Sequence, residues 1–281
     1  MARSRRVLLL AGLLCGVLSM FAGVGLGAIL MPRQAQDARE LPSLVRAKTR
    51  SPWRYGFARS QGATIARTPD RRSFYVFWPG DRRGGRVIVS MHGYFVTAID
   101  DFAYWHRYAA PRGYGVLALQ WRLGPKNAQS YTPGEIYGQA TRILRRHGIR
   151  PGDAVLHGYS SSAARTYAIA ALDRRAADYF RLFIANAGGA HRRVPLWGRV
   201  FGGGYGPRSL QGTNWVLFCG GRDRRFDTGC PLMHSTRVVI RRRGGRVQRL
   251  IVDPRARHGG FLADPASAGS ALAIFARLAG G

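Results

Sequence analysis

Short runs of apolar residues alternate with amphipathic segments along most of this chain. The short runs predict eight strands, whereas the segments with apolar positions three and four apart predict five helices. The strands are expected at Ala63–Arg67, Ser73–Trp78, Arg86–Met91, Val116–Trp121, Asp153–His157, Leu182–Asn186, Trp215–Cys219 and Val247–Val252. The helices are expected near Ala98–Ala110, Pro133–His147, Ser161–Leu172, Pro231–Arg243 and Pro265–Leu278. Alternation of this kind is typical of an α/β fold, here a mainly parallel eight-stranded sheet with helices on both faces.

The first 31 residues have a different pattern. A basic flank, Ala2–Arg6, precedes a run from Val7 to Met31 in which Ser19 is the only polar side chain. About 20 apolar residues suffice for a helix across a bilayer, and the basic flank favours a cytoplasmic N-terminus. We therefore expect an exported protein that is either anchored in the cytoplasmic membrane by residues 1–31 or secreted after signal cleavage. The segment Ser4–Leu9 also resembles a twin-arginine export signal.

Composition separates a linker from one large domain. Residues 32–60 are polar, Arg-rich and contain Pro, which predicts a linker, and residues 61–281 are long enough for one α/β domain. The chain has 44 basic and 14 acidic residues, a formal net charge of +30. Because the Arg residues are scattered and no nucleic-acid-binding motif is recognisable, we expect a solvated basic surface and no specific nucleic-acid partner.

The sequence suggests a possible disulfide and no bound cofactor. Cys15 lies in the apolar N-terminal run, which leaves Cys219 and Cys230. An oxidising compartment permits a disulfide between these two, and a pair of free buried thiols is the open alternative. No cluster of His, Cys or carboxylate residues has metal-ligand spacing, and no phosphate-binding loop follows the first predicted strand. We therefore expect neither a metal nor a nucleotide cofactor.

A serine-containing turn joins a predicted strand to a predicted helix. In a nucleophile elbow a serine stands at the tip of such a strained turn, with small residues two positions before and after it. Gly158 and Ser162 hold those positions around Ser160, although the usual pattern ends in Gly. Ser161 and Ser162 are rival nucleophiles, and a serine-rich helix N-cap is the structural alternative.

A nucleophilic serine needs a base, and the base needs a carboxylate that orients it. Asp223 follows the seventh predicted strand in Gly220-Gly221-Arg222-Asp223, and His258 follows the eighth in His258-Gly259-Gly260-Phe261. The rivals are Asp227 and Asp253 as acids and His191 and His234 as bases, although neither rival histidine follows a predicted strand.

The chain order Ser160, Asp223, His258 resembles that of the α/β-hydrolase superfamily, whose serine esterases and lipases share this triad. The resemblance covers roughly residues 60–280. It implies the α/β-hydrolase fold, with Asp223 accepting from one ring nitrogen of His258 while the other nitrogen faces Ser160. In the family, Gly-x-x-Asp and His-Gly-Gly contexts surround the acid and the base, as they do here.

The resemblance also implies an oxyanion hole built from two backbone N–H groups. One belongs to the residue after the nucleophile, here Ser161. The other belongs to the loop after the third strand, where Met91-His92-Gly93-Tyr94-Phe95 resembles the family's His-Gly-x signature, so Tyr94 is the second candidate donor. His92 itself is expected to be structural.

These features together predict a serine hydrolase that cleaves a small-molecule or polymeric carboxylic ester through an acyl-enzyme. Peptidases, lipases, polyester depolymerases and acyltransferases use the same parts. The alternative is a non-catalytic protein of this fold that binds an anionic envelope polymer, which the net charge and Ser162 in place of Gly favour. The Gly-rich stretch 187–213 is a candidate lid or substrate-binding loop. Tyr94, Phe95 and Trp197 are candidates for lining an acyl or aryl pocket, and a place in the hydrophobic core is the structural alternative.

Overall fold

The computed structural model describes residues 41–81, 85–124, 129–190, 200 and 202–280. The strands are β1 (Thr64–Arg67), β2 (Phe74–Trp78), β3 (Val87–Met91), β4 (Gly115–Leu119), β5 (Ala154–Tyr159), β6 (Phe180–Asn186), β7 (Asn214–Gly220) and β8 (Arg246–Asp253). The helices are α3 (Pro42–Arg50), α4 (Pro52–Ser60), α5 (Ala98–Ala109), α6 (Pro133–Arg146), α7 (Ala163–Asp173), α9 (Cys230–Arg242), α10 (Gly260–Ala263) and α11 (Pro265–Ala279). Two 3₁₀ turns, η2 (Ala110–Arg112) and η3 (Ser160–Ser162), complete these elements.

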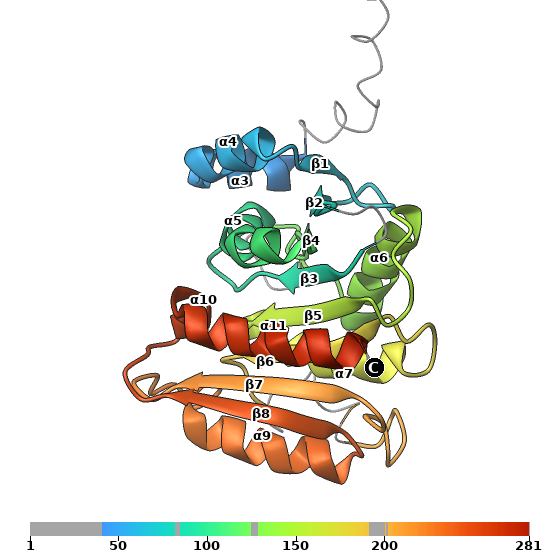
Figure 1. Cartoon of the computed structure of the whole chain (residues 1–281), viewed down its shortest axis with the longest axis vertical. Helices are drawn as coiled ribbons and strands as arrows, with labels where there is room; N and C mark the ends of the chain where they lie inside the picture. The colour runs from blue at the N-terminus through green and yellow to red at the C-terminus, as the bar shows by residue number, and fades with distance from the viewer. Residues whose placement is uncertain (1–40, 82–84, 125–128, 191–199, 201, 281) are drawn as a thin grey trace, which may run out of the picture.

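The strands form one sheet in the order β1-β2-β4-β3-β5-β6-β7-β8 (Figure 1). β1 pairs with β2 and β2 with β4 in antiparallel fashion, and every other neighbouring pair is parallel. Every residue of β3 and β4 is buried, as expected for parallel strands that are covered on both faces. The mainly parallel eight-stranded sheet predicted from the sequence is confirmed.

Alternating side chains of the sheet supply two separate cores. Val87 and Val89 of β3 pack on the face covered by α6, α7 and α9, whereas Ile88 between them packs on the face covered by α5, α10 and α11. This division follows from the period of two in a strand, since successive side chains point to opposite faces. The sheet is therefore the middle layer of three, with helices on both sides (Figure 1).

Capping boxes fix the starts of two covering helices. Thr97 accepts from the backbone N–H of Asp100 at the start of α5, and the Asp100 carboxylate accepts in return from the N–H of Thr97. Thr132 and Glu135 make the same reciprocal pair at the start of α6. Each pair satisfies two backbone donors that an uncapped helix leaves without partners.

The expected linker over residues 32–60 is wrong for residues 41–60. This part forms α3 and α4, each with Pro in its first turn, and Figure 1 shows the two helices beside α5. Leu44 and Ala47 of α3 and Ala58 of α4 are buried in the core that α5 also lines. These few buried positions are enough to attach the two helices to the domain, because Ser51 and Arg54 also donate hydrogen bonds to the Asp100 carboxylate, at 2.7 and 2.6 Å. Residues 32–40 lie outside the described ranges.

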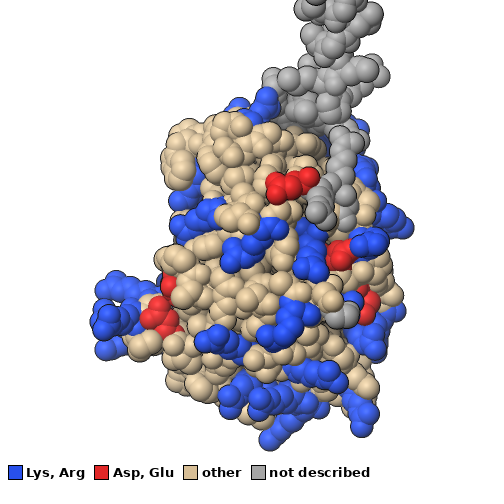
Figure 2. All heavy atoms as spheres, viewed as in Figure 1, with Lys and Arg blue, Asp and Glu red and all other residues tan. Residues whose placement is uncertain are grey.

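The N-terminal apolar run, Val7 to Met31, also lies outside those ranges. Within them, no helix is both long enough and apolar enough to cross a membrane. On the face drawn in Figure 2, Lys and Arg side chains are scattered over the surface rather than gathered in one stripe, and few acidic side chains lie among them.

Candidate active site

The turn after β5 has the geometry of a nucleophile elbow. β5 ends at Tyr159, and Ser160 has φ +57°, in the left-handed region that residues with a Cβ seldom adopt. A Cβ on Gly158 would lie 2.3 Å from Oγ1 of Thr166 and 2.8 Å from the carbonyl oxygen of Ser162, so only glycine lets strand and helix approach this closely. Backbone strain of this kind is concentrated at functional sites.

The three consecutive serines have different surroundings. The hydroxyl of Ser162 is buried, donates to the carbonyl of Met91 at 2.6 Å and accepts from the N–H of Tyr159 at 2.8 Å. The hydroxyl of Ser161 is buried, and no described residue bonds to it. Ser160 is the serine whose Oγ lies 2.8 Å from Nε2 of His258.

His258 and Asp223 continue this contact into a chain of hydrogen bonds. Nδ1 of His258 lies 2.7 Å from Oδ2 of Asp223, and the two side chains are 15% and 3% exposed. Of the rivals, His234 is exposed on α9, His191 lies outside the described residues, and the Asp253 carboxylate accepts instead from nearby backbone N–H groups. The structure thus brings Ser160, His258 and Asp223 together from three separate loops.

The surroundings of Asp223 keep its carboxylate ionised. Burial raises the pKa, but hydrogen bonds from Thr228 Oγ1, at 2.7 Å, and from His258 outweigh burial and hold the pKa of Asp223 below its usual range. An ionised carboxylate only accepts hydrogen bonds, so Nδ1 of His258 carries the proton. In neutral His258, Nε2 is then the acceptor that faces the hydroxyl of Ser160, which is the arrangement a general base needs.

A disulfide brackets the loop that carries Asp223. Cys219, near the end of β7, is bonded to Cys230, the first residue of α9, with their Cα atoms 5.1 Å apart. The alternative of two free thiols is therefore wrong for this structure. Because Thr228 lies within the bracketed loop, the disulfide restrains both the acid and the hydroxyl that bonds to it.

The loop after β3 lies directly against the elbow. A Cβ on Gly93 would lie 2.6 Å from the ring of Tyr159 and 3.6 Å from Cβ of Ser160, so Gly93 packs closely against the elbow. Nδ1 of His92 donates to the carbonyl of Gly93 at 2.7 Å. Burial lowers the pKa of His92 to about 4, so this histidine is neutral and supports the loop.

Comparison with solved structures reveals the fold, whereas neither a family model nor a curated protein matches the sequence. A putative dienelactone hydrolase from Klebsiella pneumoniae is 12% identical with a TM-score of 0.58, over 78% of this chain and 98% of that one. An esterase from Pyrobaculum calidifontis is 12% identical with a TM-score of 0.56, over 86% and 94% of the two chains. Esterase B from Lactobacillus rhamnosis is 13% identical with a TM-score of 0.56, over 85% and 96%. This chain has the α/β-hydrolase fold.

In this α/β-hydrolase fold the hydrogen-bonded residues follow three different parallel strands. Ser160 comes after β5, Asp223 after β7 and His258 after β8, so all three lie at the carboxyl edge of the sheet (Figure 1). Open α/β sheets bind their ligands at this edge. Identity this low shows the fold alone, and the chemistry has to be argued from the site.

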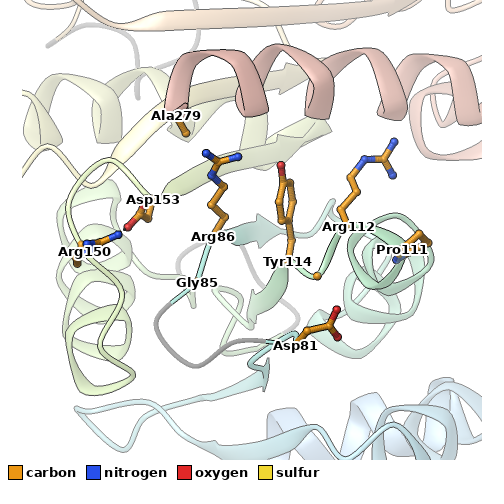
Figure 3. A pocket seen from close by; sticks show the side chains of 10 residues that line it. Asp81, Gly85, Arg86, Pro111, Arg112, Tyr114, Arg150, Asp153 and Ala279 are labelled. Carbon is orange, nitrogen blue, oxygen red and sulfur yellow. The ribbon is translucent and has the colours of Figure 1, made fainter. Parts of the chain in front are cut away.

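Two cavities lie at opposite edges of the α/β-hydrolase sheet. One, of about 710 Å³, lies beside the hydrogen-bonded chain and is lined by Gly221, Arg222, Asp223, Arg224, Arg225, Arg257 and His258. The other, of about 650 Å³, lies at the amino edge, where Tyr114 precedes β4 and Asp153 precedes β5 (Figure 3). Arg150 and Asp153 pair across 3.1 Å in the second cavity, and none of its lining residues belongs to the site around Ser160.

Three polar residues of the site carry no signal in the sequence. Thr228 reaches Asp223 only because the loop folds back. Arg122, after β4, and Arg165, in α7, reach the loops beside Ser160. In an Arg-rich chain no spacing distinguishes these two arginines from the others. Among the expected pocket aromatics, Phe95 is 69% exposed, the Tyr94 ring lies under the Arg122 guanidinium, and Trp197 is outside the described residues.

Proposed function

We propose that this α/β-hydrolase is a serine hydrolase that cleaves carboxylic esters through an acyl-enzyme. The observation that carries the proposal is the continuous hydrogen-bond chain from Ser160 through His258 to Asp223 at the carboxyl edge of the sheet. The esterases among the structural neighbours support the same reaction class.

The proposed reaction begins when Oγ of Ser160 attacks the acyl carbon while Nε2 of His258 takes its proton. The imidazolium that forms is stabilised by the Asp223 carboxylate, and it then gives the proton to the leaving alcohol as the ester C–O bond breaks. Water attacks the acyl-enzyme in the second half of the reaction, again with His258 as base. The acid is released, and Ser160 regains its proton.

We further propose that the N–H groups of Tyr94 and Ser161 bind the negative charge that develops on the carbonyl oxygen. Tyr94 follows Gly93 in the loop after β3, which packs against the elbow, and Ser161 is the residue after Ser160 in the chain. Losing one such donor costs about 3 kcal/mol of transition-state stabilisation in other hydrolases. The bond from His92 to the carbonyl of Gly93 supports this role, because it holds the peptide that contains the Tyr94 N–H.

The reaction is proposed to take place outside the cytoplasm. The apolar run from Val7 to Met31 carries that proposal, and the Cys219–Cys230 disulfide supports it, because disulfides persist in oxidising compartments. The partners proposed are an ester substrate and the membrane that the N-terminal run would enter.

Labelling with a fluorophosphonate probe tests the mechanism. The wild-type protein should be labelled at Ser160 and should hydrolyse 4-nitrophenyl esters, whereas Ser160→Ala should lose both properties and keep its thermal stability. Ser235→Ala is the matched control, since this serine is exposed on α9 and belongs to no part of the proposed site, so the variant should stay active. His258→Ala should remove most of the rate, and Asp223→Asn should lower it by up to about 10⁴-fold, as the matching change does in a serine protease.

Two results would contradict the proposal. Full hydrolysis by Ser160→Ala would exclude Ser160 as the nucleophile. A folded wild-type protein that neither reacts with the probe nor hydrolyses any ester would favour the non-catalytic alternative, a protein that binds an anionic polymer.

A further inference from the structure

Two arginines contact the loops that hold the proposed oxyanion donors. Arg122, after β4, donates from Nη1 to the carbonyl of Tyr94 at 2.6 Å. Arg165, in the first turn of α7, donates from Nη1 to the carbonyl of Ser161 at 2.8 Å. The two guanidinium groups are therefore bonded to the loop after β3 and to the turn after β5, the two segments that hold the proposed oxyanion donors.

Arg165 is a buried cation that has no acidic partner among the residues the structure describes. It is 9% exposed, its guanidinium lies 4.0 Å from the centre of the Trp121 ring, and its Nε is buried with no acceptor among the described residues. No carboxylate in the described part of the chain forms an ion pair with it. Burial and then the positive charge of Arg122 lower the pKa of Arg165 to about 10, which leaves it charged at neutral pH.

This arrangement is costly in the absence of a ligand. A buried charge without a counter-ion is destabilising, and a second cation close by adds repulsion. An apolar side chain in place of Arg165 would pack on Trp121 without either cost. Arginine is instead suited to recognising oxyanions, since its planar fork matches the two oxygens of a carboxylate.

We propose that Arg165, assisted by Arg122, binds an anionic group of carboxylate type on the ester substrate. This inference rests on the proposed function, since it names the substrate class of the same site. A guanidinium has five N–H donors, and in the described residues Arg165 uses one of its guanidinium nitrogens, at Ser161. The remaining donors match the bidentate demand of a carboxylate, which would also neutralise the buried charge.

The exposed arginines beside Asp223 and His258 have a different role. Arg222, Arg224, Arg225 and Arg257 line the cavity of about 710 Å³ beside His258. Exposed charges attract an anion over a distance. At an ionic strength of 0.1 M, however, salt largely screens this attraction beyond about 10 Å. A contact with buried Arg165 is screened much less. Salt dependence therefore separates general attraction from specific recognition.

The test compares two esters that differ in one charge. Mono-4-nitrophenyl succinate carries a free carboxylate on its acyl part, and methyl 4-nitrophenyl succinate is its neutral counterpart. The pair 4-acetoxybenzoate and methyl 4-acetoxybenzoate places the same difference on the leaving group. We expect wild-type protein to prefer the anionic member of at least one pair in kcat/KM, and to keep that preference in 0.5 M NaCl.

Substitution of Arg165 should remove the preference selectively. Arg165→Gln should lower kcat/KM for the preferred anionic ester about 10- to 100-fold, the equivalent of one hydrogen bond to a charged group, and change the neutral ester little. Arg122→Gln is a second variant that leaves α7 intact and should shift the same ratio. Arg208→Gln is the matched control, because it removes one exposed positive charge before β7, at the opposite edge of the sheet.

A binding measurement that needs no catalysis separates the two proposals. Succinate should raise the melting temperature of Ser160→Ala, and should not raise that of the Ser160→Ala/Arg165→Gln double variant. If wild type hydrolyses neutral esters and succinate has no effect, the Arg165 inference is overturned while the proposed function stands. If succinate binds through Arg165 but no ester is cleaved, the proposed function fails instead. An equal loss of both rates in Arg165→Gln would show a purely structural role and overturn the inference.

Discussion

Ser162 donates from its hydroxyl to the main-chain carbonyl of Met91 at 2.6 Å, which joins the elbow after β5 to the end of β3. The same hydroxyl accepts from the N–H of Tyr159 at 2.8 Å, and Ser162 is fully buried. The residue that stands where the usual elbow pattern has Gly therefore braces the two loops that border Ser160. Serine at this position therefore has a structural role, and its presence in place of glycine does not by itself indicate that catalysis has been lost.

Replacing Ser162 should lower stability more than activity. Ser162→Ala removes both hydrogen bonds at a buried position, and we expect a loss of about 1–2 kcal/mol in the free energy of unfolding. Ser162→Gly restores the family pattern but should be less stable still, because glycine adds backbone freedom to the unfolded chain. Urea denaturation measures both. Ser235→Ala, at an exposed serine on α9, is the control, and a Ser162→Gly protein as stable as wild type would contradict the bracing role.

Glycine at position 158 should be irreplaceable. A Cβ there would lie within 3 Å of Thr166, Ser162 and Ala163, including backbone atoms that cannot move without separating β5 from α7. Gly158→Ala should therefore fail to accumulate as folded protein or unfold at a much lower temperature. Gly138→Ala in α6 is the matched control, since the one atom near its Cβ belongs to the flexible Arg142 side chain at 3.8 Å. It should stabilise the protein by about 0.5–1 kcal/mol. Equal melting temperatures for the two variants would refute this explanation.

The hydrophobic pattern predicts the strands of the sheet, and the order of the motifs predicts the three residues that form hydrogen bonds at the site. Ser160, Asp223 and His258 each follow a predicted strand, and a parallel sheet necessarily brings the carboxyl ends of its strands to one edge. The sequence does not predict the other polar residues that support the site. Thr228 and Arg165 make their contacts through loop and helix geometry, which hydrophobic periodicity does not encode.

The helices α3 and α4 show a second limit of sequence patterns. Their buried residues, such as Leu44 and Ala58, are few, and the surrounding Arg and Pro residues are typical of a linker. Tertiary contacts stabilise these helices: they pack against α5, and Ser51 and Arg54 donate hydrogen bonds to the Asp100 carboxylate. Tertiary contacts therefore override a local composition that predicts no structure.

Reducing the disulfide should destabilise the acid loop. Cys219 and Cys230 are 11 positions apart, and closing a loop of that length contributes about 3 kcal/mol in the chain-entropy model. For a domain of this size the loss corresponds to a fall in melting temperature of roughly 6–12 °C. Calorimetry with and without dithiothreitol measures it, and the Cys219→Ala/Cys230→Ala variant should melt at the reduced temperature in both conditions. A wild-type protein whose melting is unaffected by a reductant, with both thiols alkylated, would contradict the prediction.

Asp101 should make the protein less stable as the pH rises. Its carboxyl is buried behind β3, where Oδ2 accepts from the hydroxyl of Ser90 at 2.5 Å. Burial, together with the negative charge of Asp100, raises the pKa of Asp101 to about 7. An unfolded chain releases this proton near pH 3.9, so between about pH 4 and 7 the folded state binds more protons than the unfolded state. The contribution of Asp101 to stability is therefore full below pH 4 and declines by about 1.4 kcal/mol per pH unit up to pH 7.

Asp101→Asn should abolish this decline, because the amide fills the same space and does not titrate. The free energy of unfolding, measured in urea at pH 5 and pH 8, should fall less with pH in Asp101→Asn than in wild type. Asp100→Asn is the control with the opposite sign. Burial raises the pKa of Asp100, but bonds from Ser51, Arg54 and Thr97 outweigh it and hold the pKa below its usual range, so this carboxylate stabilises the fold above about pH 4. Asp100→Asn should accordingly lose stability at pH 8, where Asp101→Asn gains it. A pH dependence identical to that of wild type in Asp101→Asn would show that Asp101 does not titrate in the folded protein over this range.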